Sequence, residues 1–288
     1  MTRFPESIVR VIRRRQVRAC ICGVGLVVFC TAFLCAGPNS SPDSLAGTSP
    51  VVDEAVRVLR AGWQTVTAPS RWDGTDVLHF GGILAVTTGA ALLDDEALSL
   101  MDQNRTARMD DIEGVVVHYG ATGTALLLAG GVYAAGLMAS DPWLRETGLL
   151  MGTALAMTTI GVQILKPLIG RARPYMGLGN HYFTPLTLDN DYQAFPSGHS
   201  AAAFSLSAVL AARINNTWAT IGLYSLATAT ALSRVYSRNH WFSDVVFSGL
   251  CSIAVSRSLV ATFEADAPTD TCLRILPAPN GIRVVVFF

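Results

Sequence analysis

Residues 233–244 read SRVYSRNHWFSD, and they interrupt an otherwise apolar part of the chain. The stretch before them reads GLYSLATATAL and the stretch after them reads VVFSGLCSIAV, both without a charged residue. Apolar segments rich in alanine, leucine, glycine and threonine, without strand-like alternation, are typical of helices that pack through small residues. The stretch therefore predicts two apolar helices with a polar, charged junction between them.

The composition favours a membrane protein. Of the 288 residues, 51% are apolar and 15% are charged, and the mean hydropathy is +0.40. Soluble domains usually carry about 25% charged residues. The formal net charge is zero, which argues against nucleic acid as a partner. The only lysine in the chain is Lys166, and a compact point charge is one reason to keep a single lysine among many arginines.

Residues 1–36 are predicted to form a signal peptide or a signal anchor. Six arginines precede the uncharged stretch 19–36, and the breaker-rich sequence GPNSSPDS follows. This is the order of an export signal, although eighteen residues are also long enough to span a bilayer as an anchor. Four of the six cysteines lie in this leader, so Cys251 and Cys272 make neither a disulfide framework nor a zinc site.

The rest of the chain divides into a linker, a helical domain and a tail. Residues 37–73 form a linker with an amphipathic helix at 51–64, residues 74–262 the domain, and residues 263–288 a tail with a possible short strand in GIRVVVFF. Within the domain, residues 94–112 are strongly charged and are expected to be solvated. Apolar helices are expected at 78–93, 113–139, 146–165, 199–213, 217–236 and 241–260. The fold class is therefore all-α, a membrane-embedded bundle of six helices.

The polar junction carries a candidate nucleophile. His240 and Asp244 are four residues apart, so on a helix they share a face. The aspartate can accept a hydrogen bond from one ring nitrogen and leave the other free as a nucleophile or base. Arg234 lies close enough along the chain to bring a fork of donors to an anion. A helix-end network without function is the alternative for this stretch alone.

Two further stretches add anion-binding groups. In 195-FPSGHS-200 a turn opens a helix, and backbone amides at a helix start form an anion cradle. His199 lies just inside this helix. In 166-KPLIGRARP-174 the residues Lys166 and Arg173 bring two more cations. Three cations and an amide nest match the equatorial oxygens of a transferring phosphoryl group.

These three stretches resemble the signature of the phosphatidic acid phosphatase type 2 and haloperoxidase superfamily. The resemblance covers about residues 74–262. The matching elements are K-x6-RP (Lys166, Arg173, Pro174), PSGH (Pro196 to His199) and SR-x5-H-x3-D (Ser233, Arg234, His240, Asp244). No signature position departs from the pattern.

The resemblance implies a role for each of these residues. His240 would be the nucleophile that forms a phosphohistidine, Asp244 would orient it, and His199 would be the general acid. The phosphate would be held by Lys166, Arg173, Arg234 and the amides of Ser197 and Gly198. It implies a metal-independent phosphatase without a cofactor, although Asp189 and Asp191 in the loop remain candidates for binding a cation.

The predicted function is hydrolysis of a phosphate monoester or pyrophosphate, on a lipid or a small phosphate ester. Phosphatidic acid, phosphatidylglycerol phosphate, undecaprenyl pyrophosphate and lipid A phosphate are equally compatible substrates. A soluble periplasmic acid phosphatase, a vanadium-dependent haloperoxidase and a non-catalytic phosphate-binding module are the alternatives. His79, His118 and His181 are interpreted as structural or peripheral.

The predicted location is a bacterial cell membrane, crossed several times, with the site facing the periplasm. The arginines of the leader keep the N-terminus inside. If the leader and the next three helices all span, Lys166 falls on the cytoplasmic side instead. A miscounted crossing, or a globular periplasmic domain behind a cleaved signal, would resolve this conflict.

Overall fold

The computed structural model of the chain describes residues 50–266, 273–278 and 281–286. The predicted signal segment 1–36 lies outside the described residues. The chain divides into two compact units, Met1–Arg60 and Ala61–Phe288. Helix α2 (Pro50–Thr67) contains the amphipathic helix predicted at 51–64, and the 3-10 helix η2 (Ala68–Arg71) follows it. The helical domain belongs to the second unit.

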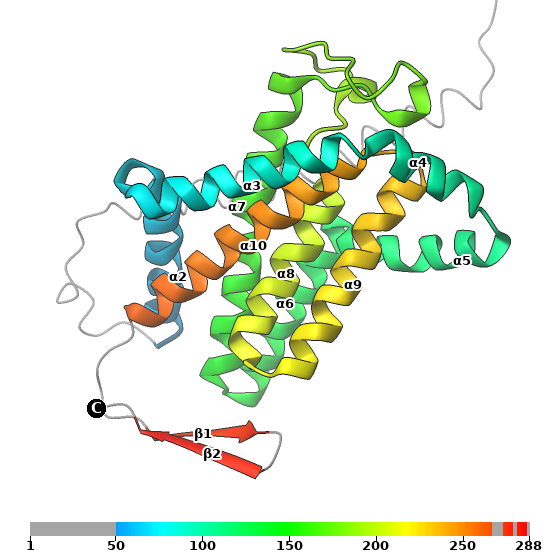
Figure 1. The fold of residues 1–288 in the computed structure, drawn as a ribbon. Helices are drawn as coiled ribbons and strands as arrows, with labels where there is room; N and C mark the ends of the chain where they lie inside the picture. The colour runs from blue at the N-terminus through cyan, green and yellow to red at the C-terminus, as the bar shows by residue number, and fades with distance from the viewer. Residues whose placement is uncertain (1–49, 267–272, 279–280, 287–288) are drawn as a thin grey trace, which may run out of the picture. The chain divides into compact units, whose positions relative to one another are not determined.

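The second unit is built around helix α8 (Gly198–Ile214). It packs against α6 (Thr122–Ala139), α7 (Pro142–Ile169), α9 (Thr217–Tyr236) and α10 (Phe242–Ala265). Figure 1 shows α6, α7, α8 and α9 running side by side. Most residues of α8 that face its neighbours are alanine or serine and are buried, so the helices approach closely through small side chains. The prediction of an all-α bundle is confirmed.

Helix α3 (Gly74–Ala91) packs against α10 and completes this helical domain. Asp73 caps the start of α3, because its carboxylate accepts the amides of Thr75 and Asp76. The six helices expected from the sequence correspond to α3 and α6 to α10, with bounds that differ by a few residues except at the start of α6.

The expectation that residues 94–112 are solvated was wrong at its first residue. This segment forms α4 (Asp94–Gln103) and most of α5 (Ala107–Val116). Asp94 is fully buried, because it binds partners from two other segments. Charge along the sequence predicts exposure only when the charge lacks a partner inside the protein.

The helix expected at 113–139 is broken by the 3-10 helix η3 (Val117–Gly120). Gly120 lies directly against the start of α8. A Cβ atom on Gly120 would be 2.4 Å from the carbonyl oxygen of His199 and 2.7 Å from the methyl of Thr230. Only glycine allows this approach, which brings η3 next to the candidate site.

The segment between α7 and α8 lies beyond one end of the bundle, as Figure 1 shows. Gly170 ends α7 in a left-handed conformation with φ of 63°. A β-bridge then joins Arg171 to Phe183, and the 3-10 helices η4 (Pro174–Met176) and η5 (Asn190–Tyr192) complete the segment. Lys166 thus lies in the last turn of α7, and Arg173 lies directly before η4.

The tail contains the short strand expected from GIRVVVFF. Strand β2 (Gly281–Val286) pairs antiparallel with β1 (Leu273–Ala278). Leu273 lies opposite Val286 in the register.

Three helices, α6, α7 and α10, are long and apolar enough to cross a membrane, and α3 with α4 would make a fourth if this pair, bent by 53°, is one span. Large apolar side chains on α6 are exposed, with Met138 at 88% and Leu127 at 78%. A water-soluble surface rarely carries so much contiguous apolar area, whereas lipid tails accommodate it. The chain is therefore a membrane protein, and the direction in which its site faces remains a prediction.

Candidate active site

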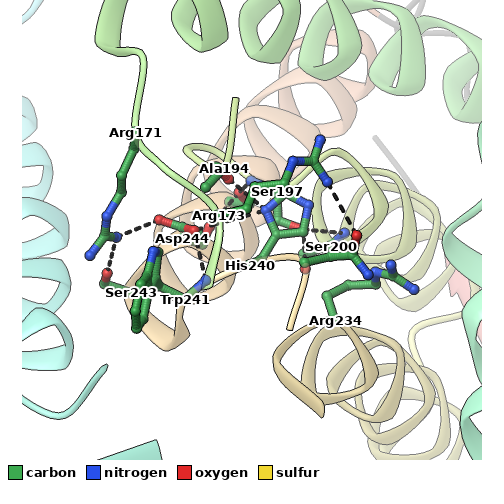
Figure 2. A network of polar contacts seen from close by, with 12 residues as sticks. Arg171, Arg173, Ala194, Ser197, Ser200, Arg234, His240, Trp241, Ser243 and Asp244 are labelled. Atoms are coloured by element: carbon green, nitrogen blue, oxygen red, sulfur yellow. Dashed lines mark hydrogen bonds and ion pairs between the residues drawn. The ribbon is translucent and has the colours of Figure 1, made fainter. Parts of the chain in front are cut away.

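The predicted site residues converge from four segments at one end of the bundle. Lys166 comes from the end of α7, Arg173 from the following loop and Arg234 from the last turn of α9. All three lie close enough to His240 for their charges, together with its burial, to lower the pKa of the imidazole well below its usual value. Figure 2 shows Arg171 on one side of His240 and Arg234 on the other.

His240 is fixed by a backbone carbonyl. Its Nδ1 atom lies 2.5 Å from the carbonyl oxygen of Ala194, and the side chain is buried. Because a carbonyl only accepts hydrogen bonds, Nδ1 carries the proton and Nε2 keeps its lone pair. The lowered pKa keeps the ring neutral at physiological pH. The geometry therefore provides an oriented imidazole with a free, nucleophilic nitrogen.

Asp244 is near His240 but is not its hydrogen-bond acceptor. The distance from His240 Nδ1 to Asp244 Oδ2 is 3.9 Å. That oxygen accepts the Trp241 amide at 2.8 Å, and Oδ1 accepts Arg171 Nη1 at 2.5 Å. The expectation that His240 and Asp244 share a helix face was wrong, because α10 begins at Phe242. Their proximity arises from the turn that starts this helix.

Arg173 and Arg234 differ in how completely their donors are used. Arg173 donates to the carbonyl and the side-chain oxygen of Asn190 and to Asn239. Arg234 Nη1 pairs with Glu113 Oε1 at 3.1 Å, whereas the buried Nε has no hydrogen-bond partner. A buried donor without an acceptor is costly unless a ligand supplies one. Arg234 is therefore arranged to receive an anionic oxygen.

The start of α8 provides fewer free amides than predicted. Ser197 is the N-cap, and its amide donates to Ser248 Oγ at 2.7 Å. The Ser197 amide is thus already satisfied, which departs from the predicted role in binding phosphate. Gly198 and His199 are the first residues of the helix, where amides have no intrahelical acceptor. The Gly198 amide therefore fits the predicted role in binding an anion, and the Ser197 amide does not.

His199 lies in a strongly cationic environment. Its burial, followed by the charges of Arg234, Lys166 and Arg173, lowers its pKa to about 4. His118, which the sequence suggested to be structural or peripheral, also contributes to this shift and so lies near the site. A bound phosphate dianion would oppose these charges and raise the pKa again. His199 thus gains a proton most readily when the site holds an anion.

Sequence reasoning missed the groups that support His240 and Asp244. Arg171 lies within KPLIGRARP, at a position that the K-x6-RP pattern leaves undefined. Asp94 lies in a charged segment that was expected to be solvated, and Ala194 contributes a backbone carbonyl that no side-chain pattern reveals. Glu113, the partner of Arg234, is also remote in sequence. A buried polar network is found only when the fold brings distant segments together.

The loop carboxylates accept hydrogen bonds from groups of their own loop. Asp191 accepts the hydroxyl of Tyr175 at 2.6 Å, and Asp189 accepts the amide of Asp191. Among the residues that the structure describes, no three side chains of histidine, cysteine, aspartate or glutamate gather as a metal site would require. Metal independence itself remains a prediction.

The described residues form a helical bundle with three cations and two histidines near one another at one end. Residues 147–266, which carry all the predicted site residues, match the PAP2 superfamily model. This match covers less than half of the chain, and it agrees with the family that its three motifs resemble.

Two known proteins are similar to parts of the chain. The lipid A 1-phosphatase of Porphyromonas gingivalis is 32% identical over 111 residues, which cover 37% of this chain and 21% of that protein. The match thus spans about a fifth of that relative's length. The crystal structure of a transmembrane PAP2-type phosphatidylglycerolphosphate phosphatase from Bacillus subtilis aligns with a TM-score of 0.55 and 20% identity, over 66% of this chain and 96% of that one. This second likeness establishes a shared fold.

Proposed function

We propose that the protein is a membrane phosphatase that hydrolyses a phosphate monoester or pyrophosphate group on a lipid. The observation that carries the proposal is the pair formed by His240 and Arg234. His240 has its Nδ1 proton bound to Ala194, and Arg234 has a buried Nε without a partner. His240 offers a nucleophile, and Arg234 offers an unused donor for an anionic oxygen. A phosphoryl group supplies both an electrophilic phosphorus atom and anionic oxygens.

The first chemical step transfers the phosphoryl group to His240. Nε2 attacks phosphorus, an N–P bond forms, and the bond between phosphorus and the leaving oxygen breaks. Lys166, Arg173 and Arg234 hold the equatorial oxygens, while His199 gives its proton to the leaving oxygen. The Ala194 carbonyl stays on Nδ1–H and stabilises the ring as it becomes cationic.

The second step returns the enzyme to its starting state. His199, now neutral, takes a proton from water as the water oxygen attacks the phosphohistidine. The N–P bond breaks, inorganic phosphate forms, and the electron pair returns to His240 Nε2. His199 regains the proton that it lost in the first step, so atoms and charges balance over the cycle.

A lipid substrate is supported by the surface near the site. The segment between α7 and α8 exposes Leu188 at 87% and Leu186 at 77%, and the same segment carries Ala194. The names of the two similar proteins, a lipid A 1-phosphatase and a phosphatidylglycerolphosphate phosphatase, also support a phosphorylated lipid. Apolar side chains next to a phosphate site suit a headgroup presented from a bilayer.

The test is phosphate release by the purified protein in detergent micelles. Phosphatidic acid, phosphatidylglycerol phosphate, undecaprenyl pyrophosphate, lipid A phosphate and the soluble p-nitrophenyl phosphate would be compared. We expect turnover that is faster for at least one lipid than for the soluble ester. No phosphate release from any of these substrates would contradict the proposal.

The same assay tests the metal-free mechanism. We expect activity to survive EDTA and to be inhibited by vanadate, which adopts the trigonal geometry of the transferring group in the cationic site. Loss of activity in EDTA, restored by magnesium, would return Asp189 and Asp191 to consideration. Oxidation of bromide that depends on vanadate and peroxide would instead favour the haloperoxidase alternative.

The proposal includes a site that faces the periplasm. A cysteine at Leu188, in a background whose native cysteines are replaced by serine, gives an accessible reporter in the exposed loop. We expect a membrane-impermeant maleimide to label it in intact spheroplasts. Labelling only after the membrane is broken would reverse the orientation.

A further inference from the structure

Arg171 lies at the centre of a buried polar network beside His240. Its Nη2 pairs with Asp94 Oδ2 at 2.6 Å and its Nη1 with Asp244 Oδ1 at 2.5 Å. Nη1 also donates to Ser243 Oγ at 2.8 Å, and Nε donates to the Asn180 carbonyl at 3.0 Å. The guanidinium thus joins two carboxylates from separate helices, and each of its nitrogens has an acceptor.

The backbone of Arg171 supports the other group that faces His240. The Arg171 carbonyl accepts the Ala194 amide at 2.9 Å, and the Ala194 carbonyl is the acceptor 2.5 Å from His240 Nδ1. The side chain of Arg171 meanwhile holds Asp244, whose Oδ2 lies 3.9 Å from the same Nδ1. Both acceptors around the ring proton are therefore held by one residue.

Asp94 fixes the far end of this network. It is fully buried at the start of α4. Its Oδ1 accepts the Ser243 amide at 2.8 Å, and its Oδ2 accepts the Ser243 hydroxyl at 2.8 Å. Asp94 therefore binds the first turn of α10 as well as the guanidinium. A buried arginine holds this position only while carboxylates compensate its charge.

We propose that Arg171, anchored by Asp94, is the positioning residue for the His240 nucleophile. It sets the Ala194 carbonyl and the Asp244 carboxylate around Nδ1, and thereby aims Nε2 at the phosphorus atom. This inference rests on the proposed phosphatase function, and it adds to its machinery Asp94 and Arg171, which occupies an undefined position of the K-x6-RP motif. The position requires a planar guanidinium, because one side chain must donate to two carboxylates on different helices at once.

Arg213 provides a matched control at the other end of α8. It is also buried, and it pairs with Glu146 at 2.9 Å and with Glu264 at 3.5 Å. Its guanidinium also lies over aromatic rings, as that of Arg171 does over Trp241. A loss that comes only from weakening a buried ion pair would be similar in both lysine variants. A positioning role predicts that the catalytic loss is confined to Arg171.

The experiment compares Arg171→Lys, Asp94→Asn and Arg213→Lys in micelles. We expect Arg171→Lys to lower kcat by about 100-fold, as a small misplacement of a reacting group does, and Asp94→Asn by about 10-fold. KM and the vanadate inhibition constant should stay within about 3-fold, because Lys166, Arg173 and Arg234 are intact. Arg213→Lys should keep kcat. Equal losses in the Arg171 and Arg213 variants, or an unchanged kcat in Arg171→Lys, would overturn the proposal.

A second readout does not depend on activity. With ring-labelled ¹⁵N-histidine, the His240 signals are assigned by their absence in His240→Ala. We expect the wild type to show a protonated Nδ1 and an unprotonated Nε2, and Arg171→Lys to show exchange between tautomers. If the wild type hydrolyses no substrate, the proposed function fails and the tautomer alone decides this inference. An unchanged tautomer in Arg171→Lys would refute it.

Discussion

The two ends of helix α8 use buried arginines in different ways. At its C-terminal end, Arg213 donates to Glu146, Glu264 and Thr147, so all three of its nitrogens have partners. Near its N-terminal end, Arg234 pairs with Glu113 through Nη1 but leaves Nε without an acceptor. A satisfied arginine stabilises the fold, whereas an incompletely satisfied one is prepared for a ligand. Of these two arginines, only Arg234 keeps a buried donor without an acceptor.

The largest effect should follow from removing the His240 nucleophile, at the end of the bundle that carries the candidate site. His240→Ala should lower kcat by on the order of 10⁴-fold or more, because no other group forms the N–P bond. Wild type quenched during turnover should hold an acid-labile phosphate on histidine, and the variant should hold none. Measurable turnover near the wild-type rate in the folded variant would contradict covalent catalysis.

The next effect concerns the unpaired donor. Arg234→Met should lower kcat/KM by roughly 10²–10³-fold, since a charge-stabilising donor is lost where the transition state gains charge. The double variant Arg234→Met/Glu113→Gln removes the carboxylate that would be left without its partner. If the double variant regains the wild-type rate, Arg234 serves only to neutralise Glu113.

The single lysine should respond differently from an ion-paired residue. Lys166→Ala should lose about 10²-fold in kcat/KM, and Lys166→Arg should recover little, because a planar fork does not replace a point charge. Steady-state kinetics with p-nitrophenyl phosphate measure both variants. Full recovery by arginine would show that only the charge matters.

The general-acid role of His199 should appear in the pH dependence of the reaction and in its dependence on the leaving group. Its pKa is lowered to about 4 by burial and by the charges of Arg234, Lys166 and Arg173, and a bound dianion should raise it. For an alkyl phosphate, kcat should therefore fall at a higher pH than kcat/KM does, because kcat/KM reports the free enzyme. His199→Asn should lose about 10²-fold with the alkyl ester and much less with p-nitrophenyl phosphate. Equal losses with both esters would remove the general-acid role.

The sequence was sufficient for most of the long apolar helices and for the clustering of the motif residues. Runs of apolar residues reveal helices, because burial requires apolar side chains on each turn. The motif residues also meet at one end of the bundle, as predicted for Lys166, Arg173, Arg234 and His240. The supporting network was not predictable in the same way. Asp94 is 149 residues from Ser243 in the chain, and nothing local distinguishes a buried carboxylate from a solvated one.

The sequence was also insufficient for the backbone groups of the site. The Ser197 amide was expected to bind phosphate, but Ser248 from α10 accepts its hydrogen bond. The proton of His240 was expected to face Asp244, but the Ala194 carbonyl is nearer. Every backbone unit offers the same donor and acceptor, so only the fold decides which of them reaches a side chain.

At the Arg213 end of the bundle, a substitution should lower stability and leave the catalytic rate unchanged. Arg213→Met would remove the buried cation that pairs with Glu146 at 2.9 Å, which should cost roughly 3 kcal/mol of unfolding free energy. Thermal unfolding in micelles should record a lower Tm, while kcat per folded molecule stays at the wild-type value. A fall in kcat without a fall in Tm would erase the distinction between the two ends.

The smallest effect should come from the exposed apolar side chains in the segment between α7 and α8. Leu186 has a left-handed backbone with φ of 63°, a conformation that costs a leucine about 1 kcal/mol and that asparagine tolerates better. The side chain is nevertheless exposed, which suits contact with lipid more than contact with water. Leu186→Asn should therefore raise KM several-fold for a lipid phosphate in vesicles, without lowering Tm. The matched substitution Leu100→Asn, at an exposed leucine on α4, controls for the loss of apolar surface elsewhere. The same KM shift for p-nitrophenyl phosphate, or an equal shift from Leu100→Asn, would show that the loop does not engage the lipid.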